Sequence, residues 1–258
     1  MRFKIVLVVR NEAFGNILPV SYQFELSSCI YKKLTENKKE YNEWLEMNGF
    51  IADNNIKHKL FSLSNFYIPK IKVEEDRLHV LARKVQFWIS FLPERGTAEF
   101  IKKILTNQVL LIGDRKTQVE FVTEGIEEIN KVDFPKSIDY LSLSPIVVSS
   151  LRQNKSVEYI SPEDLNYSQT LMNILLDKYR HFYGHDFPHQ PDYSFELLST
   201  PKRKGIFIKR FTEEETKIIG YMYKFRFKAH PALHHLIYNT GLGDKVGLGF
   251  GCVEILNT

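Results

Sequence analysis

Residues 241–251 read Gly241-Leu-Gly-Asp-Lys-Val-Gly-Leu-Gly-Phe-Gly251 and hold five of the chain's 13 glycines. Glycine permits positive φ angles and close backbone approach to a ligand, which leaves N–H groups available to face phosphate oxygens. Lys245 adds a cation at the tip of this segment. No Gly-Lys-Ser/Thr follows, and a predicted strand comes next, so neither a Walker loop nor a dinucleotide fingerprint fits. A hairpin or bulge loop without a ligand is the alternative interpretation.

The composition is that of a folded and mildly basic protein. The 258 residues include 35 Lys and Arg against 31 Asp and Glu, and 43% of the chain is hydrophobic, which rules out a disordered chain. The longest apolar run, 5–9, is strand-sized, so we expect neither a membrane span nor a signal peptide. Cys29 and Cys252 are far apart and lack a CxxC partner, which argues against a zinc site or a disulfide framework. A reduced, cytoplasmic protein is the expectation.

Strand and helix patterns in the first half follow a β-α-β-β-α-β order. Phe3, Ile5, Leu7 and Val9 alternate as in a strand with one strongly apolar face. The further predicted elements are helices at 22–34, 42–47 and 97–106 and strands at 59–66, 68–73, 78–80 and 109–122. This order is the ferredoxin-like pattern.

The pattern recurs in the second half. Strands are predicted at 144–150, 156–160, 194–200, 205–211, 218–229 and 250–255, with helices from Ser161 to about His181 and at 231–238. The sequence therefore predicts an α+β fold of tandem ferredoxin-like (RRM-like) domains, βαββαβ repeated twice. The expected boundaries are 1–125, a linker at 126–140, and 141–258, which includes the glycine-rich segment.

Basic residues gather shortly before that segment. Half of residues 201–210 are Lys or Arg, and aromatic and basic residues alternate over 223–228, so one strand face would be apolar and the other basic. A two-stranded basic ribbon suits nucleic-acid phosphates, whereas a solvated strand face is the plainer interpretation. The candidate nucleic-acid-binding residues are Lys202, Arg203, Lys204, Lys209, Arg210, Gly241, Gly243, Lys245, Gly247, Gly249 and Gly251.

Three histidines recur at four-residue spacing in His181-Phe-Tyr-Gly-His-Asp-Phe-Pro-His189. Helical spacing can bring two imidazoles to one metal ion, but Gly184 and Pro188 interrupt a helix, and no HExxH glutamate is present. We therefore predict no metal site and no cofactor. Packing within an aromatic-rich loop, or an occasional RNA contact, is the favoured interpretation.

Five segments, in this order along the chain, resemble the CRISPR repeat endoribonucleases of the Cas-six type, in the RAMP superfamily. They are residues 1–5, 29–34, 59–64, 143–148 and 247–251, so the likeness covers nearly the whole chain. The resemblance implies metal-independent cleavage of CRISPR repeat RNA in the precursor transcript, as part of antiviral defence. The upstream 2′-hydroxyl would attack in line, leaving a 2′,3′-cyclic phosphate and a 5′-hydroxyl.

Many members of that family use a Tyr/His/Lys trio. Tyr31 matches the tyrosine and Lys59 the lysine, but Glu46 stands where the histidine usually lies. His58 could supply the imidazole, although adjacent strand residues point to opposite faces. Alternatively, Tyr31, Lys59 and neighbouring cations could suffice through positioning and electrostatics. In the third alternative the chain binds repeats without cutting them.

The partner that the resemblance implies is CRISPR repeat RNA, both precursor and mature guide. It also allows other Cas proteins of a multisubunit interference complex, and a second copy of the chain in a homodimer. The alternative function is a non-catalytic repeat-RNA-binding subunit of such a complex. A small-molecule enzyme would need a closed apolar pocket with convergent polar groups, for which the sequence holds no motif.

Overall fold

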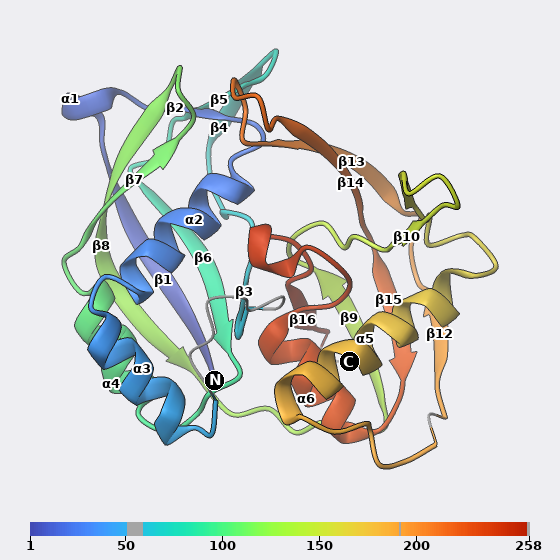
Figure 1. Cartoon of the computed structure of the whole chain (residues 1–258). Coiled ribbons are helices and arrows are strands. Elements are labelled where there is room, and N and C mark those ends of the chain that lie inside the picture. The colour runs from blue at the N-terminus through green and yellow to red at the C-terminus, as the bar shows by residue number, and fades with distance from the viewer. Residues whose placement is uncertain (51–58, 191, 257–258) are drawn as a thin grey trace. The chain divides into compact units, whose positions relative to one another are not determined.

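A computed structural model of the chain describes residues 1–50, 59–190 and 192–256. These residues fall into two compact units (Figure 1). The first unit comprises the described residues of 1–50, 65–130 and 207–217, and the second comprises 59–64, 131–206 and 218–256. No helix among these residues is long and apolar enough to cross a membrane.

The first unit is built on β1 (Arg2–Arg10), which pairs antiparallel with β6 (Lys84–Phe91) and with β8 (Gln118–Ile129). β7 (Val109–Gly113) extends the sheet beyond β8, giving the order β6-β1-β8-β7. Phe3, Ile5 and Leu7 are fully buried, because alternate side chains of a strand point to the same face. The predicted alternation over 3–9 is thus confirmed.

Helices α2 (Gln23–Leu34) and α4 (Thr97–Leu105) lie on one face of this sheet (Figure 1). α3 (Lys38–Met47) follows α2 and begins earlier than the predicted residue 42, because the Asn37 side chain caps it by accepting the Glu40 amide. The remaining elements of this unit are α1 (Asn11–Phe14), β2 (Ile17–Pro19), β4 (Ile71–Glu74) and β5 (Arg77–Val80). The three strands form a small sheet in the order β2-β5-β4.

The second unit holds an antiparallel sheet in the order β12-β15-β9-β16. Its strands are β9 (Ser137–Ser142), β12 (Ser194–Leu197), β15 (Lys224–Lys228) and β16 (Val253–Ile255), and α5 (Tyr167–Tyr183) and α6 (Pro231–Thr240) lie on one face (Figure 1). If the four strands are numbered by their order along the chain, their order across the sheet is 2-3-1-4. This is the ferredoxin-like arrangement. The α+β prediction is confirmed.

Shorter elements complete the second unit. β10 (Ser149–Leu151) and β11 (Val157–Tyr159) form a hairpin around the predicted turn at 153–155, while β3 (Phe61–Leu63) and the 3₁₀ helix η1 (Val246–Leu248) contact each other. β13 (Lys202–Ile208) and β14 (Thr216–Met222) form a separate two-stranded sheet. The tip of that hairpin, residues 207–217, belongs to the first unit.

Several predicted element boundaries were wrong. The single strand expected at 218–229 is two strands that meet at Tyr223, because β14 pairs with β13 whereas β15 pairs with β12 and β9. The helix expected from Ser161 begins at Tyr167, since the Asp164 carboxylate accepts the Ser161 amide and closes a turn instead.

Strands also occupy both ends of the predicted linker. β8 continues to Ile129 and β9 begins at Ser137, so the segment outside strands is 130–136. Charged residues over 124–133 and Pro135 suggested a linker, although Ile138 and Tyr140 alternate as a half-buried strand requires. β6, the neighbour of β1, was not predicted at all.

Candidate nucleic-acid interface and catalytic residues

Lys59 lies directly against the glycine-rich segment within the second unit. A Cβ atom at Gly247 would meet Lys59 Cγ at 3.0 Å and Cδ at 3.1 Å. Any side chain at position 247 would therefore press on the lysine stem. The close approach predicted for these glycines is real at Gly247, but the group that approaches is a lysine of this chain.

Burial lowers the pKa of Lys59 from its usual value of 10.5 to about 8. The half-buried amine loses solvation, which penalises its charged form. Its ammonium also lies 5.5 Å from the centre of the Phe61 ring. Because the pKa is close to neutral, this amine can give up a proton under physiological conditions, which is what an acid catalyst must do.

Backbone amides of the glycine-rich segment are largely engaged within the second unit. The amides of Gly241, Gly249 and Gly251 donate to backbone oxygens of Ile237, Val246 and Pro145, at 2.8, 3.0 and 2.9 Å. The expectation that these three N–H groups would be free to face phosphate is wrong. Their hydrogen bonds hold the loop together instead.

Tight packing accounts for the glycine at position 243, and the segment has an exposed cation at Lys245. Gly243 is buried, and a Cβ there would meet the Val147 oxygen at 2.3 Å, so no other residue fits. Lys245 is exposed, and Gly247 is half-buried. The part of the segment that can meet an external ligand is therefore centred on Lys245 and Gly247.

Lys178 anchors the start of the glycine-rich segment. Its side chain extends from α5, is 1% exposed, and donates from Nζ to the Gly241 oxygen at 2.7 Å. Burial lowers the pKa of Lys178 from 10.5 to about 7, although the charge of Asp244 acts in the opposite direction. Asp244 in turn accepts the Ser149 amide at 3.0 Å and its hydroxyl at 2.7 Å. Three hydrogen bonds thus fix the loop between Gly241 and Asp244.

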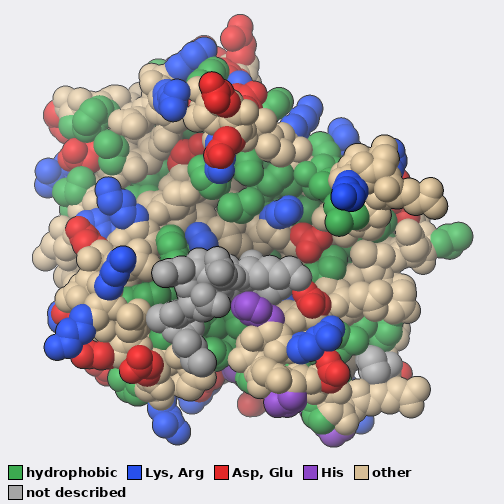
Figure 2. All heavy atoms as spheres, viewed as in Figure 1, with side chains coloured by type: hydrophobic (Ala, Val, Ile, Leu, Met, Phe, Trp, Pro, Cys, Tyr) green, Lys and Arg blue, Asp and Glu red, His purple; other side chains and the backbone are tan. Residues whose placement is uncertain are grey.

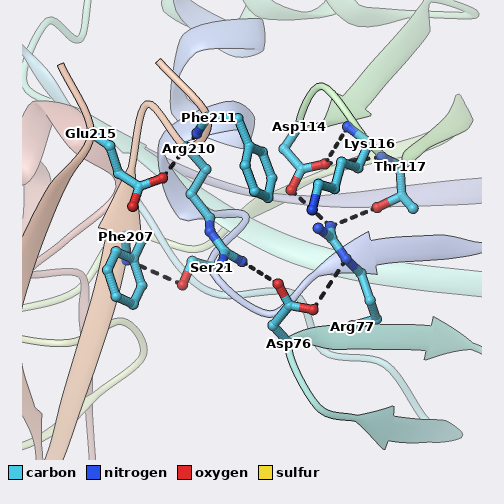
Figure 3. Close-up of polar contacts among 10 residues, drawn as sticks. All are labelled: Ser21, Asp76, Arg77, Asp114, Lys116, Thr117, Phe207, Arg210, Phe211 and Glu215. Carbon is cyan, nitrogen blue, oxygen red and sulfur yellow. Dashed lines mark hydrogen bonds and ion pairs between the residues drawn. The ribbon is translucent and has the colours of Figure 1, made fainter. Parts of the chain in front are cut away.

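The hairpin tip is held in the first unit by ion pairs. Arg210 Nη1 lies 2.6 Å from Asp76 Oδ2, and Arg77 Nη1 lies 2.7 Å from Asp114 Oδ2 (Figure 3). The hydrogen bond from Arg210 is the main reason that the pKa of Asp76 lies below its usual value. Both arginine side chains are largely buried, at 17% and 15% exposed, so these pairs are only partly screened by water.

The Phe211 ring lies among three cations of this tip and its surroundings. The ring centre is 4.2 Å from Lys116 Nζ, 4.9 Å from the Arg210 guanidinium carbon and 6.0 Å from that of Arg77 (Figure 3). The Phe211 backbone also accepts a hydrogen bond from Arg115 Nη1 at 3.0 Å. Cation–π and backbone contacts therefore add to the ion pairs that hold the tip.

Two family models together match residues 17–255 of the chain. The family described as "CRISPR associated protein Cas6, C-terminal" matches residues 126–255, and "CRISPR-associated protein Cas6, N-terminal" matches residues 17–126. The chain belongs to the Cas6 family. The sequence-based recognition is thereby confirmed.

Two relatives from Pyrococcus are similar to this Cas6 chain over nearly its full length. The CRISPR-associated endoribonuclease Cas6 of Pyrococcus furiosus is 26% identical over 99% of this chain and 90% of the relative. The endoribonuclease-like protein Cas6nc of Pyrococcus horikoshii is 25% identical over 99% of this chain and all of the relative.

Solved Cas6 structures share the fold. The structure titled "Characterization of a Cas6-related gene from Pyrococcus furiosus" has a TM-score of 0.79 at 23% identity, covering 100% of this chain and 98% of that one. "An RAMP protein binding different RNA substrates" has the same TM-score at 24% identity and covers both chains fully. The tandem ferredoxin-like fold predicted from the sequence is confirmed.

The remaining residues of the expected Cas6 trio lie in different parts of the chain. Tyr31 is half-buried on α2 and Glu46 is exposed on α3, both in the first unit, whereas Lys59 belongs to the second. Burial, assisted by the neighbouring Tyr31, raises the pKa of Tyr41 to about 12. His58 lies outside the described residues. The catalytic roles of Tyr31, Glu46, His58 and Lys59 stay predictions.

Only some cations of the predicted basic ribbon are available to bind a phosphate. Lys209 pairs with Glu214 and Arg210 with Asp76, so binding a phosphate would compete with a carboxylate at both positions. Lys202, Arg203 and Lys204 are exposed, and no carboxylate of the described ranges lies within ion-pair distance of them. Figure 2 accordingly shows acidic and basic side chains intermixed over the hairpin tip and the neighbouring β4–β5 turn.

The second strand of the predicted ribbon is also placed differently. Lys224, Arg226 and Lys228 do share the exposed face of β15, as the alternation predicted. However, β15 pairs with β12 and β9, so it does not form one ribbon with β13. Arg226 is bound to Asp139 at 2.7 Å, which removes a further cation from the expected RNA path.

Sequence reasoning missed Lys178. Leu171, Leu175 and Lys178 follow one another at helical spacing on the buried face of α5. A lysine on an otherwise apolar stripe is the signal that could have identified it, because burying an amine requires a specific partner. No set of three or more His, Cys, Asp or Glu side chains that could hold a metal ion occurs among the described residues.

Proposed function

We propose that this Cas6 chain is an endoribonuclease that cuts CRISPR repeat RNA in the precursor transcript without a metal ion. The family membership and the similarity to a Pyrococcus furiosus protein named as a CRISPR-associated endoribonuclease support the RNA substrate. The observation that carries the proposal is the position of Lys59, which is partly desolvated and lies against Gly247 of the glycine-rich segment.

The reaction is an internal transfer at one phosphate. The 2′-oxygen upstream attacks phosphorus as a base takes its proton, the bond from phosphorus to the 5′-oxygen breaks, and an acid gives that oxygen a proton. The products are a 2′,3′-cyclic phosphate and a 5′-hydroxyl. A lysine with a pKa of about 8 suits the acid step, and its charge stabilises the phosphorane.

Tyr31 is the proposed second participant, with His58 or Glu46 as the third. Tyr31 matches the family's tyrosine, Glu46 stands at the position of its histidine, and His58 is proposed because it directly precedes Lys59. Lys245 and the exposed cations Lys202, Arg203 and Lys204 are the proposed phosphate contacts, because they are accessible and carry no carboxylate partner within the described ranges. Positioning by these contacts would hold the strand in line for attack.

Incubation of the protein with labelled repeat RNA in excess EDTA tests the proposal. We expect a cyclic-phosphate product, and we expect it to disappear when the nucleotide upstream of the cut carries a 2′-deoxyribose. Cleavage that requires added metal, or that survives the deoxy substitution, would contradict the mechanism. Phosphatase and kinase treatment of the product ends identifies the termini directly.

A non-catalytic repeat-binding subunit is the second candidate. Glu46 stands where the family usually has histidine, and the 25% identical relative is named endoribonuclease-like. Other Cas proteins, or a second copy of this chain, would be its partners in an interference complex. Tight binding of the repeat with no product, unaffected by changing Lys59 to alanine, would favour this function over the first.

A further inference from the structure

The histidine-rich run at 181–189 has no place in the proposed reaction, yet one of its members meets a distant histidine. His189 stacks on His230, which caps the N-terminus of α6, with ring centres 4.7 Å apart and an interplanar angle of 24°. Phe187 packs its edge against both rings at 5.5 Å. Figure 2 shows histidine side chains around the ends of α5 and α6.

These three rings line a hollow of about 100 Å³ within the second unit. Ala229 and Leu233 form a buried apolar part of its wall. Drug-sized ligands occupy roughly 300 Å³ or more, whereas a water molecule takes about 30 Å³. By volume, the hollow therefore suits a ligand about the size of a single aromatic ring.

The rim of the hollow carries an excess of positive charge. Lys228 pairs with Asp192 at 3.3 Å, and Lys136 is exposed and forms no ion pair within the described ranges. Two lysines against one carboxylate leave one positive charge. His230 Nδ1 accepts the Ala232 amide, so the neutral ring carries its proton on Nε2 and can donate there. Gln190 adds an amide to the lining.

We propose that this hollow holds a single nucleobase of a bound RNA strand, stacked on the rings of His189 and its neighbours, with an adjacent phosphate at Lys136. The inference rests on the RNA binding proposed above. Aromatic rings beside cations are what single-stranded RNA sites use, since every base presents a π-face. A metal ion fits less well, because no set of three ligating side chains occurs among the described residues.

An abasic scan tests the site. Labelled repeat RNAs, each with one abasic nucleotide, are titrated with the wild-type protein in EDTA and with His189→Ala, which alters an exposed ring and should not disturb folding. We expect one abasic position to lower the affinity of the wild-type protein for the RNA about ten-fold. His189→Ala should lower the affinity for intact RNA about as much, and the abasic RNA of that position should bind this variant no more weakly than intact RNA does. His189→Tyr should restore binding, because a larger ring stacks as well.

His185→Ala is the matched control, since His185 lies in the same loop and packs on Tyr179 but does not line the hollow. The inference is overturned if His189→Ala binds intact RNA like the wild type, if it loses affinity equally for every abasic RNA, or if EDTA weakens wild-type binding. If His189→Ala and one abasic position fail to add, but the protein does not cut the RNA, the base site stands and the proposed enzyme is refuted. If the protein cuts the RNA but the two changes simply add, the enzyme stands and the base site is refuted.

Discussion

Cations at the hairpin tip and cations beside the glycine-rich segment lie in opposite electrostatic environments. At the tip, Arg210 and Arg77 each bind a carboxylate, of Asp76 and Asp114 respectively, at 2.6 and 2.7 Å. Beside the glycine-rich segment, Lys178 bonds a backbone oxygen, and burial lowers its pKa and that of Lys59 toward neutrality.

The difference separates two uses of positive charge. An arginine bound to a carboxylate holds a structure in place, but it has little attraction left for a phosphate. A desolvated lysine destabilises the folded chain, yet its low pKa lets it exchange a proton near neutral pH. Counting Lys and Arg in the sequence treats both groups alike, whereas only the second has the properties of a catalytic group.

Changing Lys59 should give the largest effect. We expect Lys59→Ala to slow cleavage of repeat RNA by about 10²- to 10⁴-fold, the usual loss for a proton-transfer group, and to weaken binding far less. In the wild type, the rate should fall above about pH 8 as the lysine loses the proton that it donates. Single-turnover rates from pH 6 to 10 measure both effects.

Lys59→Arg is the companion variant, since it keeps the charge but does not titrate in this range. Its rate should show no fall above pH 8. Equal losses of binding and cleavage in Lys59→Ala would make the residue a structural one.

Replacing Lys178 tests the cost of a buried amine. The folded pKa is about 7 and the ordinary value 10.5, so between these limits the unfolded chain binds more protons and stability rises with pH. This contribution is on the order of a few kcal/mol and is absent from Lys178→Met. The free energy of unfolding of the wild type, relative to that of the variant, should therefore increase between pH 7 and pH 9.5.

Urea unfolding of both proteins at the two pH values measures this increase. Subtracting the variant's free energy of unfolding from that of the wild type cancels the similar contribution of Lys59, which both proteins contain. A difference that does not change with pH would show that Lys178 keeps its ordinary pKa in the folded chain.

Arg203 and Arg210 provide a matched pair for RNA binding. Arg203→Ala removes an exposed cation, so the slope of log affinity against log salt should become shallower by about 0.7, the value for one contact to a single strand. Arg210→Ala removes a cation already bound to Asp76 and should leave the slope unchanged. Filter binding between 50 and 300 mM salt tests both, and the opposite result would put the RNA at the hairpin tip.

The smallest expected effect is the coupling between Arg210 and Asp76. Because the carboxylate side chain is 44% exposed, solvent screens the pair, and we expect a coupling energy of about 1 kcal/mol or less. Unfolding of Arg210→Ala, Asp76→Ala and the double variant measures it. Strictly additive effects would mean that the Phe211 contacts hold the tip without help from this pair.

Local patterns predicted most elements of the fold. The alternation over 3–9 gave β1, the helices predicted at 22–34 and 97–106 match α2 and α4 within a few residues, and the turn at 153–155 gave the β10–β11 hairpin. The strand over 218–229 could not be divided from sequence, because Tyr223 carries no break signal and only the choice of pairing partners separates β14 from β15.

The sequence by itself determined the paired ferredoxin-like architecture, the glycine-rich segment and the family, because periodicity and motif spacing are properties of neighbouring residues. Tertiary structure alone decided which cations are neutralised and which are desolvated. Arg210 meets Asp76, Lys59 meets Gly247 and Lys178 meets Gly241 across long stretches of chain. The electrostatic state of a side chain depends on the solvent and charges around it in space, and these are set only when distant segments pack together.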